Sequence, residues 1–205
     1  MKNLCFAIAA CIMACCPAIA QEDHYGKPYG QYAVGIRAGD PMGFSVIEKR
    51  ENHAFEFNIG MASFAGLFNY YERNFNRWRG FDDYTLEDYR VNHGGAMQLH
   101  YLMYHDLSDG LKWYVGGGGQ IRWFSIKYWY DVTYQDLATH KPVTQKWSAT
   151  SVEKDLGLDG VIGVDYQPDG FPLNLFLDIT PFVELWENPG MMMLQAGIGV
   201  RYVLN

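Results

Sequence analysis

The sequence predicts an all-β protein, an eight-stranded antiparallel up-and-down β-barrel. Apolar and polar residues alternate along eight segments of the 205-residue chain, as they do in half-buried strands. The chain is 16% aromatic and contains 22 glycines, a mixture that alternating strands produce. No segment shows the 3.6-residue apolar repeat of an amphipathic helix. The eight segments are 31–50, 53–63, 66–75, 94–106, 111–128, 152–166, 172–186 and 190–205.

Residues 1–20 predict a secretory signal peptide, and residues 21–205 predict a single barrel domain. Lys2 supplies a charged tip, an apolar run follows, and Ala18-Ile19-Ala20 fits a cleavage site, so we expect cleavage after Ala20. The alternative is lipidation at Cys15. Cleavage would remove all four cysteines, and with them disulfides, thiolate catalysis and cysteine-ligated zinc.

Charge and composition exclude several classes of function. The net charge is −7, and loss of Lys2 with the leader makes it about −8, which argues against binding nucleic acid. The six histidines lack the spacing of metal ligands. The acidic residues of 76–93 could hold a divalent cation but lack EF-hand spacing. We therefore expect no metal and no cofactor.

The lengths of the connections predict which ends of the strands share a side of the barrel. The first segment contains Gly39-Asp40-Pro41 and is expected to be one kinked or bulged strand. All even-numbered connections are then short, and both long ones are odd-numbered, as in a membrane barrel whose termini are both periplasmic. The odd connections are 51–52, 76–93, 129–151 and 187–189, and the even ones are 64–65, 107–110 and 167–171.

Alternation leaves two kinds of barrel open. In DLGLDGVIGVDY (155–166), one face is apolar and the other carries acids and glycine. A soluble lipocalin-like barrel would turn the apolar face inward, whereas a membrane barrel would turn it to lipid. Glycine mixed with charge favours the membrane barrel, because the narrow interior of eight strands holds long side chains only beside small ones. The glycines on polar faces are Gly116, Gly118, Gly157, Gly163, Gly197 and Gly199.

Two tryptophans on one apolar face also favour the membrane barrel. Trp113 and Trp123 are ten residues apart, which places them about 25 Å apart along the membrane normal for a strand tilted by roughly 40°. That distance matches the apolar band between two aromatic girdles, although ordinary core tryptophans remain the alternative. The predicted girdle residues are Trp113, Trp123, Tyr166 and Tyr202.

The predicted lumen holds paired charges. Asp159 and Asp178 should lie on adjacent strands and point inward, where two unpaired carboxylates would be costly. We expect each to pair with an arginine or both to share a proton, with a path for ions or small solutes as the alternative. The predicted lumen network is Arg37, Glu56, Arg122, Asp155, Asp159, Asp178 and Arg201, and Lys112, Asp165 and Glu184 are further inward candidates.

The last strand carries a recognisable pattern. QAGIGVRY (195–202) resembles the terminal β-signal by which outer-membrane barrels of Gram-negative bacteria are recognised for insertion, although VLN follows where an aromatic end is common. Together with GLKWYVGGGGQIRW (110–123) and residues 156–185, the mature chain resembles small outer-membrane β-barrel proteins, most of them without known function. The resemblance implies outer-membrane location and contact with the barrel-insertion machinery. It implies no catalytic residues.

We therefore expect an integral outer-membrane protein with a plugged lumen that is not an enzyme. It would act in envelope structure or through its loops, with outer-membrane lipids and lipopolysaccharide as partners. One alternative is a lipid A hydrolase or acyltransferase with a site at the rim, which needs a serine beside a histidine base. His105 should point outward and His100 inward, while Ser108 lies in a turn and Ser125 on the next strand. Another alternative is a soluble periplasmic ligand-binding barrel.

The loop 129–151 is aromatic and has two interpretations. It contains Trp129, Tyr130, Tyr134 and Trp147. Exposed aromatic side chains can mark a binding surface, or they can extend the outer girdle.

Overall fold

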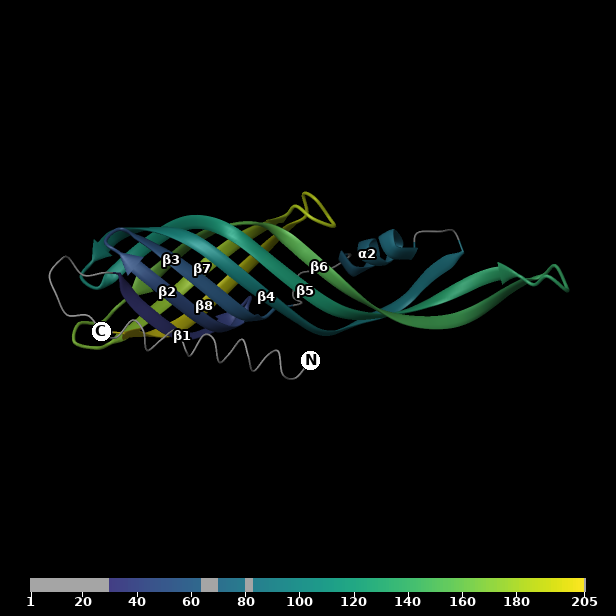
Figure 1. The fold of residues 1–205 in the computed structure, drawn as a ribbon, viewed down its shortest axis with the longest axis horizontal. Coiled ribbons are helices and arrows are strands. Elements are labelled where there is room, and N and C mark those ends of the chain that lie inside the picture. The colour runs from purple at the N-terminus through teal and green to yellow at the C-terminus, as the bar shows by residue number, and fades with distance from the viewer. Residues whose placement is uncertain (1–29, 64–69, 80–82, 205) are drawn as a thin grey trace.

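A closed ring of eight antiparallel strands forms the body of the protein, as the sequence predicts. The structure, a computed structural model, describes residues 30–63, 70–79 and 83–204. The strands are β1 (Gln31–Gly39), β2 (Met42–Arg50), β3 (His53–Met61), β4 (Tyr84–Ser108), β5 (Leu111–Gln135), β6 (Pro142–Tyr166), β7 (Leu173–Glu184) and β8 (Met192–Leu204). Each pairs with the next, and β1 pairs with β8 from Tyr32 opposite Leu204 to Gly39 opposite Gly197, which closes the ring (Figure 1).

The barrel is apolar outside and polar inside. The odd-numbered residues of β7 from Leu173 to Pro181 are exposed, and the even-numbered residues from Asn174 to Glu184 are buried. A water-soluble barrel has the opposite arrangement. The period-2 alternation of the sequence therefore becomes an outer surface of aliphatic and aromatic side chains around a charged interior.

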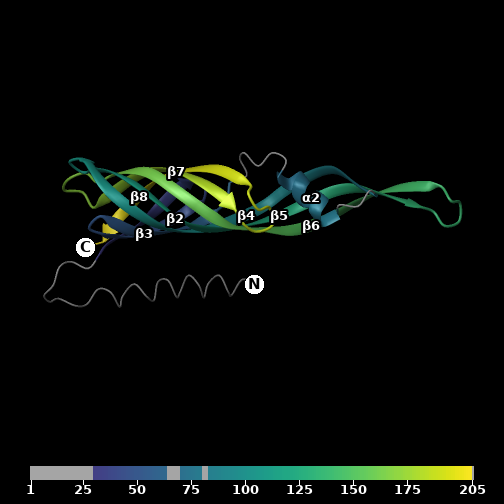
Figure 2. The same ribbon diagram turned by 90° about the horizontal axis from the view of Figure 1, so that it is seen from above.

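Three strands continue far beyond the ring. β4, β5 and β6 each have 25 residues, or about 80 Å at roughly 3.3 Å per residue. Pairing of β4 with β3 stops at Ala96, and pairing of β6 with β7 stops at Gly157. Above these residues only β4, β5 and β6 remain, and they form a three-stranded sheet that projects from one end of the barrel (Figures 1 and 2).

A helix covers the inner face of this sheet. The helix α2 (Tyr70–Arg79) lies against the projecting strands (Figure 2). Tyr71 and Phe75, one turn apart, are buried against β5, with the Phe75 ring centred 5.4 Å from the Tyr130 ring. We call this buried group the aromatic cap. It comprises Ala62, Tyr71, Phe75, Ala96, Phe124, Ile126, Tyr128 and Tyr130.

Two of the eight predicted strand segments are wrong. One contains two strands and the other contributes none among its described residues, so the number of strands is still eight. The segment 31–50 is two strands joined by a turn at Asp40 and Pro41, not one kinked strand. Of the segment 66–75, residues 66–69 lie outside the described residues, and residues 70–75 form the start of α2 instead of a strand. Since the chain turns at Asp40, residues 51–52 form the second connection and lie at the same end as the turn at 109–110.

The two long loops predicted at 76–93 and 129–151 are mostly regular structure. The first contains the end of α2 and the start of β4, and the second is a continuous hairpin whose tip is residues 136–141. Tyr130 lies in the aromatic cap, whereas Trp147 is 56% exposed. Long connections at one end and tight turns at the other remain the pattern of the barrel.

The predicted signal peptide, with its cleavage site after Ala20 and its cysteines, lies outside the described residues. Among the described residues, no helix is long and apolar enough to cross a membrane.

Truncation of Phe75 should release α2 while leaving the barrel folded. Phe75→Ala removes a ring that is 1% exposed, at a cost of about 3–5 kcal/mol for a buried phenylalanine. Trypsin should then cut α2 faster, and the variant should keep the heat-modifiable migration of a closed barrel on gels. Glu72→Ala, an exposed change on the same helix, is the control. Equal cleavage of both variants would contradict the role of Phe75.

Candidate functional site

A chain of ion pairs crosses the middle of the lumen. The Arg201 guanidinium donates to Glu56, and His100 Nδ1 lies 2.9 Å from the other Glu56 oxygen. His100 Nε2 lies 3.2 Å from Asp159 Oδ2. The ring therefore lies between two carboxylates, and of its two nitrogens Nδ1 has the geometry of a hydrogen bond, towards Glu56. All four side chains are at least 94% buried.

A second pair lies in the same part of the lumen. The two terminal nitrogens of Arg37 each donate to one Asp178 oxygen at 2.6 Å, a bidentate arrangement. The Tyr114 hydroxyl donates to Asp178 at 3.3 Å. Arg201 and Arg37 both lie over the Phe176 ring, with Arg201 Cζ 3.6 Å from its centre. The two arginines therefore both contact the ring of Phe176.

The two ends of the lumen are also filled. Towards the 51–52 turn, Lys49 Nζ donates to Asp165 at 2.9 Å, and Asn174 donates to the same carboxylate. Towards the projecting sheet, a chain of amides includes Gln98, whose Nε2 donates to Gln120 at 3.0 Å. Above the amides, Arg122 lies 3.3 Å from Asp40 and donates to the Ser63 carbonyl at 3.0 Å. Polar groups thus fill the barrel from the lower turns to the aromatic cap.

Glycines on the inner wall make this filling possible. A Cβ at Gly197 would overlap the Arg37 guanidinium, and one at Gly163 would overlap the Tyr114 ring. At Gly157 and Gly199 a Cβ would meet a phenylalanine ring and also a backbone carbonyl. The large neighbours expected from the sequence are present at these four glycines, and a close backbone carbonyl restricts all of them except Gly197 as well. At Gly116 and Gly118 the nearest atoms belong to the backbone of β4.

The structure places the predicted residues as follows. Asp178 pairs with Arg37, but Asp159 pairs with His100, a residue that sequence reasoning considered only as a possible base. Lys112 lies at the lower rim, 42% exposed and paired with Asp106, instead of inside the lumen. Asp155 lies opposite Arg122 in the β5–β6 register. The seven predicted lumen residues, all buried, are Arg37, Glu56, Arg122, Asp155, Asp159, Asp178 and Arg201.

The predicted girdle residues lie on the outer wall. Trp113, Tyr166 and Tyr202 are near the end with the tight turns, and Trp123 is near the projecting sheet. None of the four is buried. The His105 ring stacks on Trp113, with ring centres 4.5 Å apart. Their positions match two levels of aromatic residues at the limits of the apolar surface.

A hydrolase or acyltransferase would need a serine beside a histidine, and Ser125 with His93 is the pair considered in the described residues. Ser125 lies opposite His93 in the β4–β5 register, on the outer face, which the sequence could not reveal because it does not give the register. The described residues show no hydrogen bond between Ser125 and His93. In the described part of the chain, no group of three or more His, Cys, Asp or Glu side chains could hold a metal ion.

Three solved structures are similar to this chain, each at low sequence identity and with a TM-score below 0.5. The N-terminal β-barrel domain of Pseudomonas aeruginosa OprF is 13% identical over 85% of this chain and 95% of its own, with a TM-score of 0.45. The attachment invasion locus protein Ail of Yersinia pestis is 10% identical over 86% and 100%, with a TM-score of 0.45. Neisserial surface protein A is 13% identical over 85% and 95%, with a TM-score of 0.40. No protein-family model and no curated protein sequence matches the chain.

The Arg37–Asp178 pair should be strongly coupled. Asp178→Asn leaves the buried Arg37 charge without its carboxylate, and loss of one member of a buried pair costs about 3–5 kcal/mol. The double variant Arg37→Met/Asp178→Leu removes both charges and should be more stable than Asp178→Asn. Urea unfolding in lipid vesicles, followed by tryptophan fluorescence, measures the difference. A double variant that is no more stable than Asp178→Asn would refute the coupling.

Proposed function

We propose that the protein is an integral outer-membrane barrel with a plugged lumen and no enzymatic activity. The observation that carries the proposal is the exposed apolar band around the barrel, which alternates residue by residue with buried charges. Contiguous apolar surface of this extent marks contact with a membrane or a partner. The residues at its middle include Leu158, Ile162, Leu177 and Ile198, each at least 50% exposed.

The end with long β4–β6 strands would face the cell exterior. Both described ends of the chain, Gly30 and Leu204, lie with the tight turns, which fits periplasmic termini. β8 would carry the insertion signal, since residues 195–202 lie within it. The filled lumen favours a structural role over a pore, because Arg201, Tyr114 and Phe182 are fully buried there. Envelope integrity or contacts of the projecting sheet would then be its biological role.

A basic strip on the outer face supports lipopolysaccharide as a partner. Arg90 and Lys127 lie directly opposite each other on β4 and β5, and like charges in that arrangement destabilise a sheet. Neither has a carboxylate partner among the described residues, and Lys127 lies 4.9 Å from the Trp129 ring centre. Lys127 is four residues beyond Trp123 on β5, and Arg90 is beside it, so both lie about 10 Å further out along the membrane normal. The phosphate groups of a glycolipid would lie at this level. A phosphate there would relieve the repulsion.

A charge on the apolar band should impair membrane insertion. Leu158→Arg places a cation near the bilayer midplane, at a cost of about 2–4 kcal/mol. The control is Leu137→Arg, the same change at the 92% exposed tip of the β5–β6 hairpin. Heat-modifiable migration and urea stability in phospholipid vesicles should fall only for Leu158→Arg. Equal behaviour of both variants, or release of the wild-type protein by osmotic shock, would exclude the membrane barrel.

Neutralising the basic strip should weaken binding of phosphorylated lipid A. Two cations near a lipid surface contribute about 1 kcal/mol each, so Arg90→Gln/Lys127→Gln should lower affinity by about tenfold or more at low salt. Native mass spectrometry in detergent, with dephosphorylated lipid A as the comparison ligand, measures the change. The control is Arg50→Gln/Lys141→Gln, which also removes two positive charges but at other places on the surface. Equal losses in the two double variants would reject the strip as the contact.

A further inference from the structure

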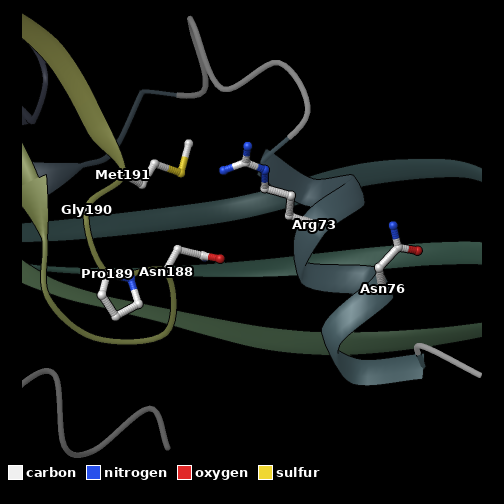
Figure 3. Close-up of a pocket in the computed structure, with 6 residues that line it drawn as sticks. All are labelled: Arg73, Asn76, Asn188, Pro189, Gly190 and Met191. Carbon is white, nitrogen blue, oxygen red and sulfur yellow. The ribbon is translucent and has the colours of Figure 1, made fainter.

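A cavity lies outside the lumen, between α2 and the β7–β8 loop (Figure 3). Its volume is about 430 Å³, within the range of sites for small ligands. It belongs to the end with the projecting sheet, so a ligand would enter from water and not from the apolar band. Its lining residues are Arg73 and Asn76 of α2, and Asn188, Pro189, Gly190 and Met191 of the loop.

The loop wall of the cavity has a fixed shape. The Asn188 backbone N–H donates to Glu184 Oε1 at 2.7 Å, and the Gly190 N–H donates to the Glu184 carbonyl at 2.9 Å. Glu187 has a φ of 60° and Gly190 a φ of 85°, both in the left-handed region that most residues avoid. A loop held in this way is ordered before a ligand arrives, which lowers the entropic cost of binding.

The loop and the helix are joined at the cavity. Asn188 Nδ2 donates to Asn74 Oδ1 at 2.7 Å, and both side chains are more than 90% buried. Asn74 Nδ2 is a buried donor that finds no acceptor in the described part of the chain. The amide pair therefore sets the distance between the two walls.

The Arg73 guanidinium lines the cavity without a carboxylate partner among the described residues. The Arg73 side chain extends from α2 towards the loop, and Met191 extends from the loop towards α2 (Figure 3). No described carboxylate forms an ion pair with Arg73. A guanidinium presents donors in a planar fork that matches a carboxylate or a phosphate. An anionic group on the ligand would complete this wall.

The remaining lining fits the rest of a sugar. The exposed carboxamide of Asn76 offers donors and an acceptor to hydroxyl groups. Met191 and Pro189 supply apolar surface for the C–H face of a sugar ring. A free inorganic anion would leave this apolar surface unused, and an apolar ligand would desolvate Arg73 without a partner.

We propose that the cavity between α2 and the β7–β8 loop binds a sugar unit that carries a carboxylate or a phosphate, with Arg73 holding the anionic group. This site goes beyond the proposed membrane role and is independent of it, because the lining residues lie outside the barrel wall.

The test measures binding to the full barrel in detergent micelles by ligand-observed NMR. The probes are glucuronate, glucose 6-phosphate, glucose and inorganic phosphate. Glucuronate or glucose 6-phosphate should bind at least tenfold more tightly than glucose, and the stronger of the two identifies the anionic group. Arg73→Gln should weaken that binding at least tenfold, and Arg73→Lys should weaken it less. Arg50→Gln, at the opposite end of the barrel, should leave it unchanged.

Three results would overturn the proposal. They are absence of saturable binding by both anionic sugars, equal affinity for inorganic phosphate and glucose 6-phosphate, and wild-type affinity in Arg73→Gln. Each sample is checked for heat-modifiable migration, so that loss of the folded barrel is distinguished from loss of the site.

Discussion

Pairing of charge inside a narrow barrel is the constraint on which the rest of the structure depends. Eight strands enclose a space only just wide enough for side chains, and a buried ion without a partner is costly there. The carboxylates of Glu56, Asp159 and Asp178 are accordingly held by Arg201, His100 and Arg37. These pairs join strands distant in sequence, and for Arg37 and Asp178 the separation is 141 residues. The pairing of Arg37 with Asp178 therefore depends on strands at the two ends of the chain being brought together in the ring.

The constraint on the interior also determines the exterior. Because alternate residues of each strand point inward to the charges, the others must form the outer wall, and they are apolar. Where the ring ends, β4–β6 lose that arrangement and need another cover for one face. The aromatic cap supplies it, and α2 contributes Tyr71 and Phe75. Burial raises the pKa of the Tyr128 phenol in this cap above its ordinary value.

The errors made from the sequence have identifiable physical causes. The turn at Asp40 and Pro41 has two residues, so Arg37 before it and Ser45 after it are both buried at odd-numbered positions. The alternation therefore continues through the turn without a change of phase, and two strands resemble one. The helix α2 was missed because its core contact is a short pair, Tyr71 and Phe75, without a longer apolar stripe. That i, i+4 pair was the available signal.

The sequence by itself determined the eight-stranded barrel class and most of the residues that point inward, because period-2 alternation is a local property of the chain. It also predicted that Asp159 and Asp178 would find arginines or share a proton, and of the two Asp178 pairs with an arginine. Only the tertiary structure decided which partner each acid takes, that His100 lies between Glu56 and Asp159, and that Arg73 and Met191 face one cavity. These depend on strand register and on α2 docking, which are set by contacts between residues far apart in the chain.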